Sequence, residues 1–106
     1  MHSEQVREYQ LGKLRFSFTD LKMYDGEEAI SLTQREADLL KFFCEHPNKV
    51  LKREEVLLHV WGKDDYFLGR SMDVFISKLR KYLKAEPGIV LETIHGIGFR
   101  FSVPHS

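Results

Sequence analysis

The sequence has very little cysteine and no long apolar run. Cys44 is the single cysteine among 106 residues, so the chain cannot form an internal disulfide, which fits a reducing compartment. No apolar stretch approaches the ~20 residues that a membrane-spanning helix requires. The first eight residues are polar and lack the apolar segment of a secretory signal. These features favour a cytoplasmic protein that does not enter a membrane.

The patterns of a metal site or a catalytic centre are also missing. The histidines are scattered, without the spacing of metal ligands: they are His2, His46, His59, His95 and His105. The glycine pair Gly96 and Gly98 falls in a predicted hairpin turn and not in the strand-to-helix loop that binds phosphates. No grouping of Ser, His and Asp indicates a nucleophile. We therefore expect a protein that is not an enzyme and has no catalytic residue, metal or cofactor.

Neither sign of charge dominates, because 16 Lys and Arg balance 16 Asp and Glu. Positive charge is nevertheless concentrated in residues 69–84, where five Lys or Arg accompany one Asp and give a net charge of +4. The same stretch has an apolar stripe at helical spacing, formed by Met72, Ile76, Leu79 and Leu83. It predicts a helix from about Arg70 to Lys84 with a buried face and a basic face. A basic face suits an anionic partner, although many basic helices merely solvate their outer side.

The rest of the chain reads as one domain over residues 9–103, with a flexible lead-in at 1–8 and a tail at 104–106. Leu14, Phe16 and Phe18 alternate with polar residues, the pattern of a half-buried strand. Further short runs cover 21–24 and 29–32, separated by the turn pair Asp25-Gly26. These runs predict an antiparallel sheet of three or four strands from Tyr9 to Leu32.

Two helices are predicted to follow this sheet. Thr33 and Glu36 form the pattern of a capping box, so we expect a helix from there to about Glu45, before His46-Pro47-Asn48. Cys44 should be a buried, inert thiol on this helix. A second helix is predicted for residues 52–61 and should end at Gly62, and residues 63–69 should form a loop.

The C-terminal residues predict a β-hairpin. Residues 89–94 and 99–103 are the strands, and the glycine-containing segment 95–98 is the turn. The order is thus a sheet, three helices and a hairpin, in which two successive helices end in a basic one. This order indicates an α+β winged helix-turn-helix.

The chain resembles the C-terminal effector domains of OmpR/PhoB-type bacterial response regulators from about Tyr9 to Val103. The residues that carry the resemblance are Leu32-Thr33-x-x-Glu36 with Leu39-Leu40, Arg53-Glu54-x-Val56-Leu57, Val60-Trp61-Gly62, Arg70-Ser71-Met72-Asp73-Val74-x-Ile76-x-x-Leu79-Arg80-Lys81-x-Leu83 and Glu92-Thr93-Ile94-His95-Gly96-Ile97-Gly98-Phe99-Arg100-Phe101. The resemblance implies a four-stranded N-terminal sheet, three helices and a C-terminal wing. It also implies sequence-specific binding of double-stranded DNA and transcription regulation within a two-component phosphorelay.

Roles for the basic helix follow from its exposed face. Lys78 can reach the O6 and N7 atoms of guanine in the major groove, and Val74 can pack on a thymine methyl group. Residues better placed for phosphates are Arg70, Ser77, Arg80 and Lys81. The resemblance adds three further contacts: Trp61 to the DNA backbone, and His95 and Arg100 on the wing. A packing role for Trp61 is an equal alternative.

Two positions of the wing depart from the family pattern. His95 stands where several members insert Arg into the minor groove, and a neutral imidazole is a weaker anchor. Phe99 stands where Tyr is common, and we expect it to pack in the core. Minor-groove binding by this wing is therefore an open question at this point.

The resemblance also implies partners. These are direct-repeat half-sites on DNA, RNA polymerase, and a receiver domain and sensor kinase of a longer protein. The domain would be excised from that protein, and a stand-alone effector domain is the alternative. The polymerase would meet the loop that contains Asp64, Asp65, Tyr66 and Phe67, although the aromatic pair could instead fold onto the core. The isolated domain should be monomeric off DNA. The alternative is a winged helix that binds protein, which would favour apolar residues in place of Arg70, Lys78 and Lys81.

Overall fold

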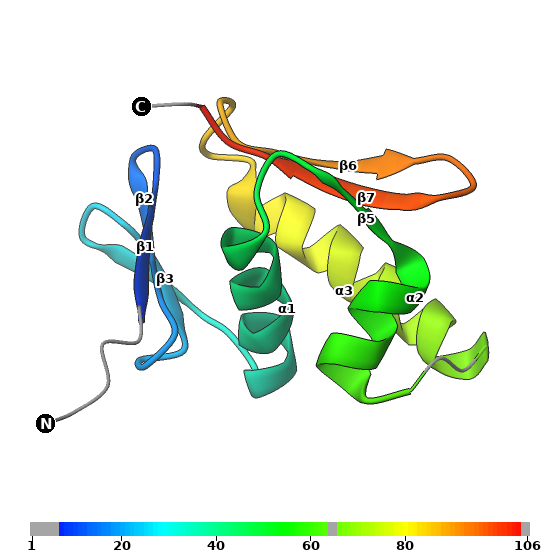
Figure 1. The fold of residues 1–106 in the computed structure, drawn as a ribbon. Coiled ribbons are helices and arrows are strands. Elements are labelled where there is room, and N and C mark those ends of the chain that lie inside the picture. The colour runs from blue at the N-terminus through cyan, green and yellow to red at the C-terminus, as the bar shows by residue number, and fades with distance from the viewer. Residues whose placement is uncertain (1–6, 64–65, 105–106) are drawn as a thin grey trace, which may run out of the picture.

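The computed structural model describes residues 7–63 and 66–104 and has two antiparallel sheets separated by helices (Figure 1). The elements in chain order are β1 (Glu8–Leu11), β2 (Leu14–Ser17), β3 (Lys22–Asp25), β4 (Glu28–Ser31), α1 (Gln34–Glu45), β5 (Val50–Lys52), α2 (Arg53–Val56), η1 (Leu57–Trp61), α3 (Tyr66–Leu83), β6 (Val90–Ile94) and β7 (Gly98–Ser102). The predicted α+β winged helix-turn-helix is confirmed. We call β6, β7 and the turn between them the wing.

The N-terminal sheet has four strands in the order β1-β2-β3-β4, so every strand pairs with its neighbour in sequence. Its register places Phe16 opposite Met23, and both side chains are buried. The prediction of a small antiparallel sheet is confirmed. β1 begins at Glu8, inside the segment expected to be a lead-in, while residues 1–6 of that segment lie outside the described residues.

The helix α1 begins with the capping box that the sequence indicates. The amide of Glu36 donates to the Thr33 hydroxyl (3.2 Å), and the amide of Thr33 donates to a carboxylate oxygen of Glu36 (2.9 Å). Two backbone donors that have no partner inside the helix are thereby satisfied. α1 lies between the N-terminal sheet and the other helices (Figure 1).

Cys44, near the end of α1, lies at the edge of the core. Burial, reinforced by the charge of Glu45, raises the pKa of the Cys44 thiol. A raised pKa keeps the thiol protonated at neutral pH, and the thiolate is the reactive form. The expectation of an inert thiol therefore agrees with its environment, although the residue is only partly buried.

The second sheet contains a strand that we did not predict. β5 lies at the edge of the order β5-β7-β6, and Leu51 pairs with Phe99. Lys52, expected as the first helical residue, is the last residue of this strand. Gly98 belongs to β7 and not to the turn, and a side chain there would place its Cβ 1.9 Å from the Leu51 carbonyl oxygen. The close approach of β5 and β7 therefore requires glycine at this position.

The second helix is interrupted by a wider turn. Only residues 53–56 are α-helical, and η1 continues as a π-helix whose last turn is closed by a bond from the Gly62 amide to the Leu57 carbonyl (3.0 Å). Gly62 has a φ of +88° and ends the helix as predicted. Such wide turns occur mostly as local insertions in helices and often near functional residues.

The prediction of a loop over residues 63–69 is wrong for its second half, because α3 already begins at Tyr66. In the structure Gly69 is buried inside α3, and its carbonyl accepts a hydrogen bond from Arg53 Nη2 (3.0 Å). An added Cβ would lie 3.1 Å from that nitrogen. The lack of a side chain at Gly69 thus lets the Arg53 guanidinium approach α3 closely.

A single hydrophobic core joins both sheets and the helices. Its fully buried members come from β2, β3, α1, α2, α3 and β7, and include Phe16, Phe43, Met72, Leu79 and Phe101. Phe99 is also buried, as expected for a packing residue. None of the described helices has the length and apolar character needed to cross a bilayer.

Candidate nucleic-acid interface

The helix α3 has two faces in opposite environments. The four apolar residues of its stripe are all buried, as predicted: Met72, Ile76, Leu79 and Leu83. The six residues expected to meet DNA are all exposed: Arg70, Val74, Ser77, Lys78, Arg80 and Lys81. Val74 keeps 55% of its surface exposed, an unusual position for an aliphatic side chain on a core helix. The helical periodicity therefore oriented α3 correctly.

The one acidic residue on the exposed side of α3 is neutralised by a neighbour. Asp73 accepts a charged hydrogen bond from Arg53 Nη1 (2.7 Å), and Arg53 also donates to the Gly69 carbonyl. This ion pair ties the start of α2 to the first half of α3 and offsets the negative charge within the basic face. Arg53 is a positioning residue that we did not identify from the sequence, because its partners lie 16 and 20 positions along the chain.

Lys78 contacts the first turn of α1 in the DNA-free domain. Its Nζ lies 4.0 Å from a carboxylate oxygen of Glu36 and 5.6 Å from the centre of the Phe75 ring. Glu36 is only 3% exposed and also accepts a hydrogen bond from the Tyr82 hydroxyl (3.2 Å). The Lys78 side chain is half-exposed, so the ammonium can leave this weak contact by rotation about its flexible stem.

Arg80 joins α3 to the wing. Its Nε donates to the Leu91 carbonyl (2.7 Å), and its Nη2 donates to the Thr93 hydroxyl (2.6 Å). Both acceptors belong to β6, the strand at the free edge of the second sheet. A guanidinium has five N–H donors, so three remain available on the exposed side chain. Its predicted role, a phosphate contact, therefore comes with a second connection that the sequence did not indicate.

The turn of the wing projects away from the core. His95 and Ile97 are exposed, and Ile97 keeps 50% of its surface accessible. Gly96, between them, adopts a φ of +77°, which side chains other than glycine rarely tolerate. Arg100 lies further back on β7 and forms an ion pair with Glu92 (2.9 Å). The structure thus places His95 at the tip and Arg100 on the sheet.

Trp61 packs at the junction of η1 and α3. Its ring meets the edge of Phe75 with centroids 5.7 Å apart, and the guanidinium of Arg35 lies 5.1 Å from the ring. Arg35 also donates to the Val60 carbonyl. The packing role of Trp61 is therefore present in the structure, while its partial exposure leaves room for a contact with the DNA backbone.

Most of the residues expected to contact RNA polymerase lie outside the part of the chain that the structure describes. Asp64 and Asp65 lie outside the described residues, as do the side chains of Tyr66 and Phe67. The backbone of the aromatic pair forms the first turn of α3. The segment between η1 and α3 is therefore shorter than predicted.

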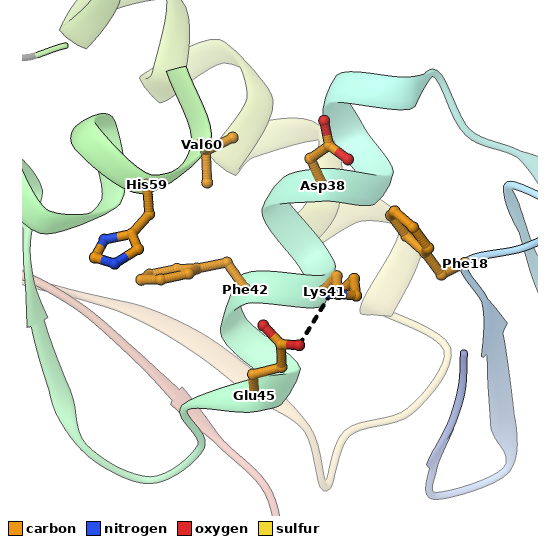
Figure 2. A pocket seen from close by; sticks show the side chains of 7 residues that line it. All are labelled: Phe18, Asp38, Lys41, Phe42, Glu45, His59 and Val60. Atoms are coloured by element: carbon orange, nitrogen blue, oxygen red, sulfur yellow. Dashed lines mark hydrogen bonds and ion pairs between the residues drawn. The ribbon is translucent and has the colours of Figure 1, made fainter. Parts of the chain in front are cut away.

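A hollow of about 250 Å³ lies along α1, between η1 and Phe18 (Figure 2). Phe18 and Phe42 flank it, and His59 stacks on Phe42 with ring centroids 4.9 Å apart. Lys41 crosses it to pair with Glu45 at 3.0 Å, the dashed line in Figure 2. None of its lining residues belongs to the exposed face of α3. Within residues 7–63 and 66–104, no three His, Cys, Asp or Glu side chains are placed to hold a metal ion.

Comparison with known proteins agrees with this arrangement. Residues 26–101 match the family model described as "Transcriptional regulatory protein, C terminal". The chain is 40% identical over 96 residues to the transcriptional regulatory protein RprY of Bacteroides fragilis. This match covers 91% of the chain and 41% of RprY. The chain is also 41% identical over 105 residues to the phosphate regulon regulatory protein PhoB of Escherichia coli, covering 96% and 44%. The chain thus spans less than half the length of these relatives.

A solved structure shows the same fold on DNA. The Klebsiella pneumoniae RstA DNA-binding domain, in complex with the RstA box, superposes with a TM-score of 0.75 at 27% sequence identity. The match covers 94% of this chain and all of that domain. The likeness extends over both sheets and the helices between them.

Proposed function

This chain belongs to the family of C-terminal domains of transcriptional regulatory proteins, and we propose that it binds double-stranded DNA in a sequence-specific way to control transcription. The observation that carries this proposal is the exposed face of α3, on which Arg70, Lys78 and Lys81 lie beside an exposed Val74. An α-helix fits the major groove, where each base pair presents a distinct pattern of donors and acceptors.

In this proposal two residues of α3 read bases. Lys78 leaves Glu36 and donates to guanine, while Val74 packs its methyl groups on thymine. The contact that Lys78 gives up is weak, since 4.0 Å is at the outer limit for an ion pair. Glu36 keeps the Tyr82 hydroxyl and the Thr33 amide as partners when Lys78 moves. The exchange therefore leaves no buried carboxylate without hydrogen bonds.

The neighbouring residues bind phosphates and so fix the position of α3. Arg70, Ser77 and Lys81 occupy the same exposed face, and the outward N–H groups of Arg80 face its flank. We assign weaker contacts to Trp61, which is mostly engaged in packing, and to Arg100, whose charge is shared with Glu92. His95 and Ile97 at the wing tip are placed to meet the adjacent minor groove.

A protein-binding role for α3 is a poorer fit. The core of a protein interface is depleted in charged residues, whereas the exposed face of α3 carries lysine and arginine on successive turns. Only Val74 is a large apolar residue exposed on this helix among the residues whose exposure is described.

Selection of bound sites from random duplexes tests the proposal directly. The expected result is a short consensus sequence, with affinity that falls steeply as salt concentration rises. The selected duplex and a scrambled duplex of the same composition should then be compared at one salt concentration. Equal affinity for both would refute sequence-specific binding, while binding to neither would refute the interaction with DNA.

We also propose that the domain is the output part of a longer response regulator, with a receiver domain and a sensor kinase as its partners. The support is that the matching curated relatives are more than twice as long as the matched region. Binding to direct-repeat half-sites and a monomeric state off DNA belong to the same proposal. Sedimentation of the free domain, and of its complex with one and two half-sites, distinguishes these states.

Contact with RNA polymerase is a further part of this proposal. Asp64 and Asp65 are acidic, and side chains of that charge are unsuited to a position against phosphate. Reversing both charges to Lys should leave operator affinity unchanged or slightly higher and lower transcription from a dependent promoter. Full transcription at full operator occupancy would refute a polymerase contact.

A further inference from the structure

Among the described residues, hydrogen bonds from one exposed side chain link α3 to β6 of the wing. Arg80, in the last two turns of α3, donates to the Leu91 carbonyl (2.7 Å) and to the Thr93 hydroxyl (2.6 Å). These acceptors are two residues apart on β6, and Thr93 lies two residues before His95 at the wing tip. The two bonds therefore act on the part of β6 that leads to the tip.

The plane of the guanidinium makes this connection directional. Nε and Nη2 project from one planar group in a fixed arrangement, so the positions of both acceptors define the angle between α3 and β6. A lysine ammonium also has three N–H donors, but they rotate at the end of a flexible stem and so do not fix the relative positions of two acceptors. Arg80 is therefore suited to hold the wing at one angle, which a positive charge alone would not do.

Backbone pairing attaches this end of the wing to the domain through β7. β6 is an edge strand, paired only with β7, and β7 is held by β5 up to Gly98. The turn beyond is attached to the domain by a bond from the Arg53 amide to the Ile97 carbonyl (3.1 Å). On the β6 side, the Arg80 bonds are the hydrogen bonds that reach α3 among the described residues.

We propose that Arg80 is a positioning residue that sets the angle of the wing relative to α3 before DNA is bound. The inference rests on the proposed function, because a fixed angle lets α3 enter the major groove and the wing tip reach the DNA beside it. A pre-organised wing loses little conformational entropy when DNA binds, so the affinity for DNA is higher. Arg80 thus contributes to DNA binding through Thr93 as well as through any phosphate that its outward N–H groups meet.

Two substitutions separate positioning from charge. Arg80→Lys keeps the positive charge but lacks the fixed pair of donors of the guanidinium, and Thr93→Val removes one acceptor while leaving the charge of Arg80 intact. Valine has nearly the shape of threonine and suits a strand. Lys84→Arg, one residue past the end of α3 and without a side-chain hydrogen bond to the described residues of β6, is the matched control for a change between the two basic side chains.

The first measurement is hydrogen exchange of the DNA-free domain. Both Arg80→Lys and Thr93→Val should speed exchange of the amides from Thr93 to Gly98, while the amides in the middle of α3 remain as protected as in the wild type. A residue that acts only as a phosphate contact would change neither. Unchanged exchange at the wing in both variants would overturn the proposal.

The second measurement is affinity for the selected operator duplex. Each variant should weaken binding by about tenfold, the range of one charge-assisted hydrogen bond, and the double variant should be no weaker than the worse single one. Strictly additive effects, or wild-type affinity for Thr93→Val, would overturn the proposal. If the wild-type domain binds no duplex, the proposed function fails instead, and the exchange data still decide whether Arg80 holds the wing.

Discussion

The two faces of α3 belong to one helix, yet their side chains differ in burial and in freedom to move. Met72 and Leu79 on the inner face are fully buried in the hydrophobic core, where close packing restricts their side chains. Lys78 and Lys81 on the outer face are exposed and can move to meet a ligand. The inner face thus serves stability and the outer face serves recognition. Substitutions on the two faces should therefore change different measured quantities.

The largest effect is expected on the inner face. Leu79→Ala should lower the free energy of unfolding by about 2–5 kcal/mol, because it leaves a cavity at a fully buried position. Urea denaturation measures the loss, and Ser77→Ala on the outer face is the control, with a change within about 0.5 kcal/mol. If Leu79→Ala unfolds like the wild type but loses DNA binding, the assignment of the faces is wrong.

A change of base preference is expected from the outer face. Lys78→Ala should relax the preference at one operator position by about 1–3 kcal/mol with little change in stability. The measurement is a comparison of affinities for all four base pairs at each position, with Lys84→Ala as the matched control. Equal weakening of operator and random duplexes would assign Lys78 to phosphate contact.

A smaller and uniform effect is expected one turn further along. Lys81 is exposed and has no ion pair with any other described residue, so its charge is available to phosphate. Lys81→Ala should weaken all duplexes alike and reduce the slope of log affinity against log salt by roughly one unit. A changed consensus sequence with an unaltered salt slope would contradict this role.

The smallest effect concerns Tyr82, at the border between the two faces. Burial, then the charge of Glu36 and its hydrogen bond, raise the pKa of Tyr82 above its ordinary 10.0. Above about pH 10 the folded protein therefore keeps a proton that the unfolded chain loses, and the free energy of unfolding falls as pH rises further. Tyr82→Phe should show a shallower fall over this range in denaturation experiments. Identical pH profiles for the two proteins would contradict the shift.

Features that depend on neighbours in sequence could be predicted. The capping box needs only Thr33 and Glu36, and the hairpins of the N-terminal sheet join strands that follow one another. The exposure of the six candidate residues on α3 followed from the apolar stripe on its opposite side. All of these signals extend over a few residues, within reach of a spacing rule.

Features that depend on distant residues could not be predicted. β5 has three residues and pairs with β7, a strand near the C-terminus. No hairpin turn joins the two strands, so the sequence around β5 contains no turn signal for this pairing. The first turn of α3 lies in the predicted loop 63–69, and the hydrogen bond that Gly69 accepts inside α3 comes from Arg53, 16 positions earlier in the chain. The wide turn of η1 likewise has no local pattern that distinguishes it from an α-helix.

The sequence by itself determined that α3 has an apolar face and a basic face, and that a glycine-tipped hairpin follows it, because periodicity and turn residues act locally. The tertiary structure alone decided that Arg80 holds Thr93 of the wing and that Lys78 lies near the buried Glu36. These contacts join segments whose relative positions depend on how the core packs. A side chain such as Arg80 has several rotamers of similar energy, and only the acceptors that packing brings within reach select one of them.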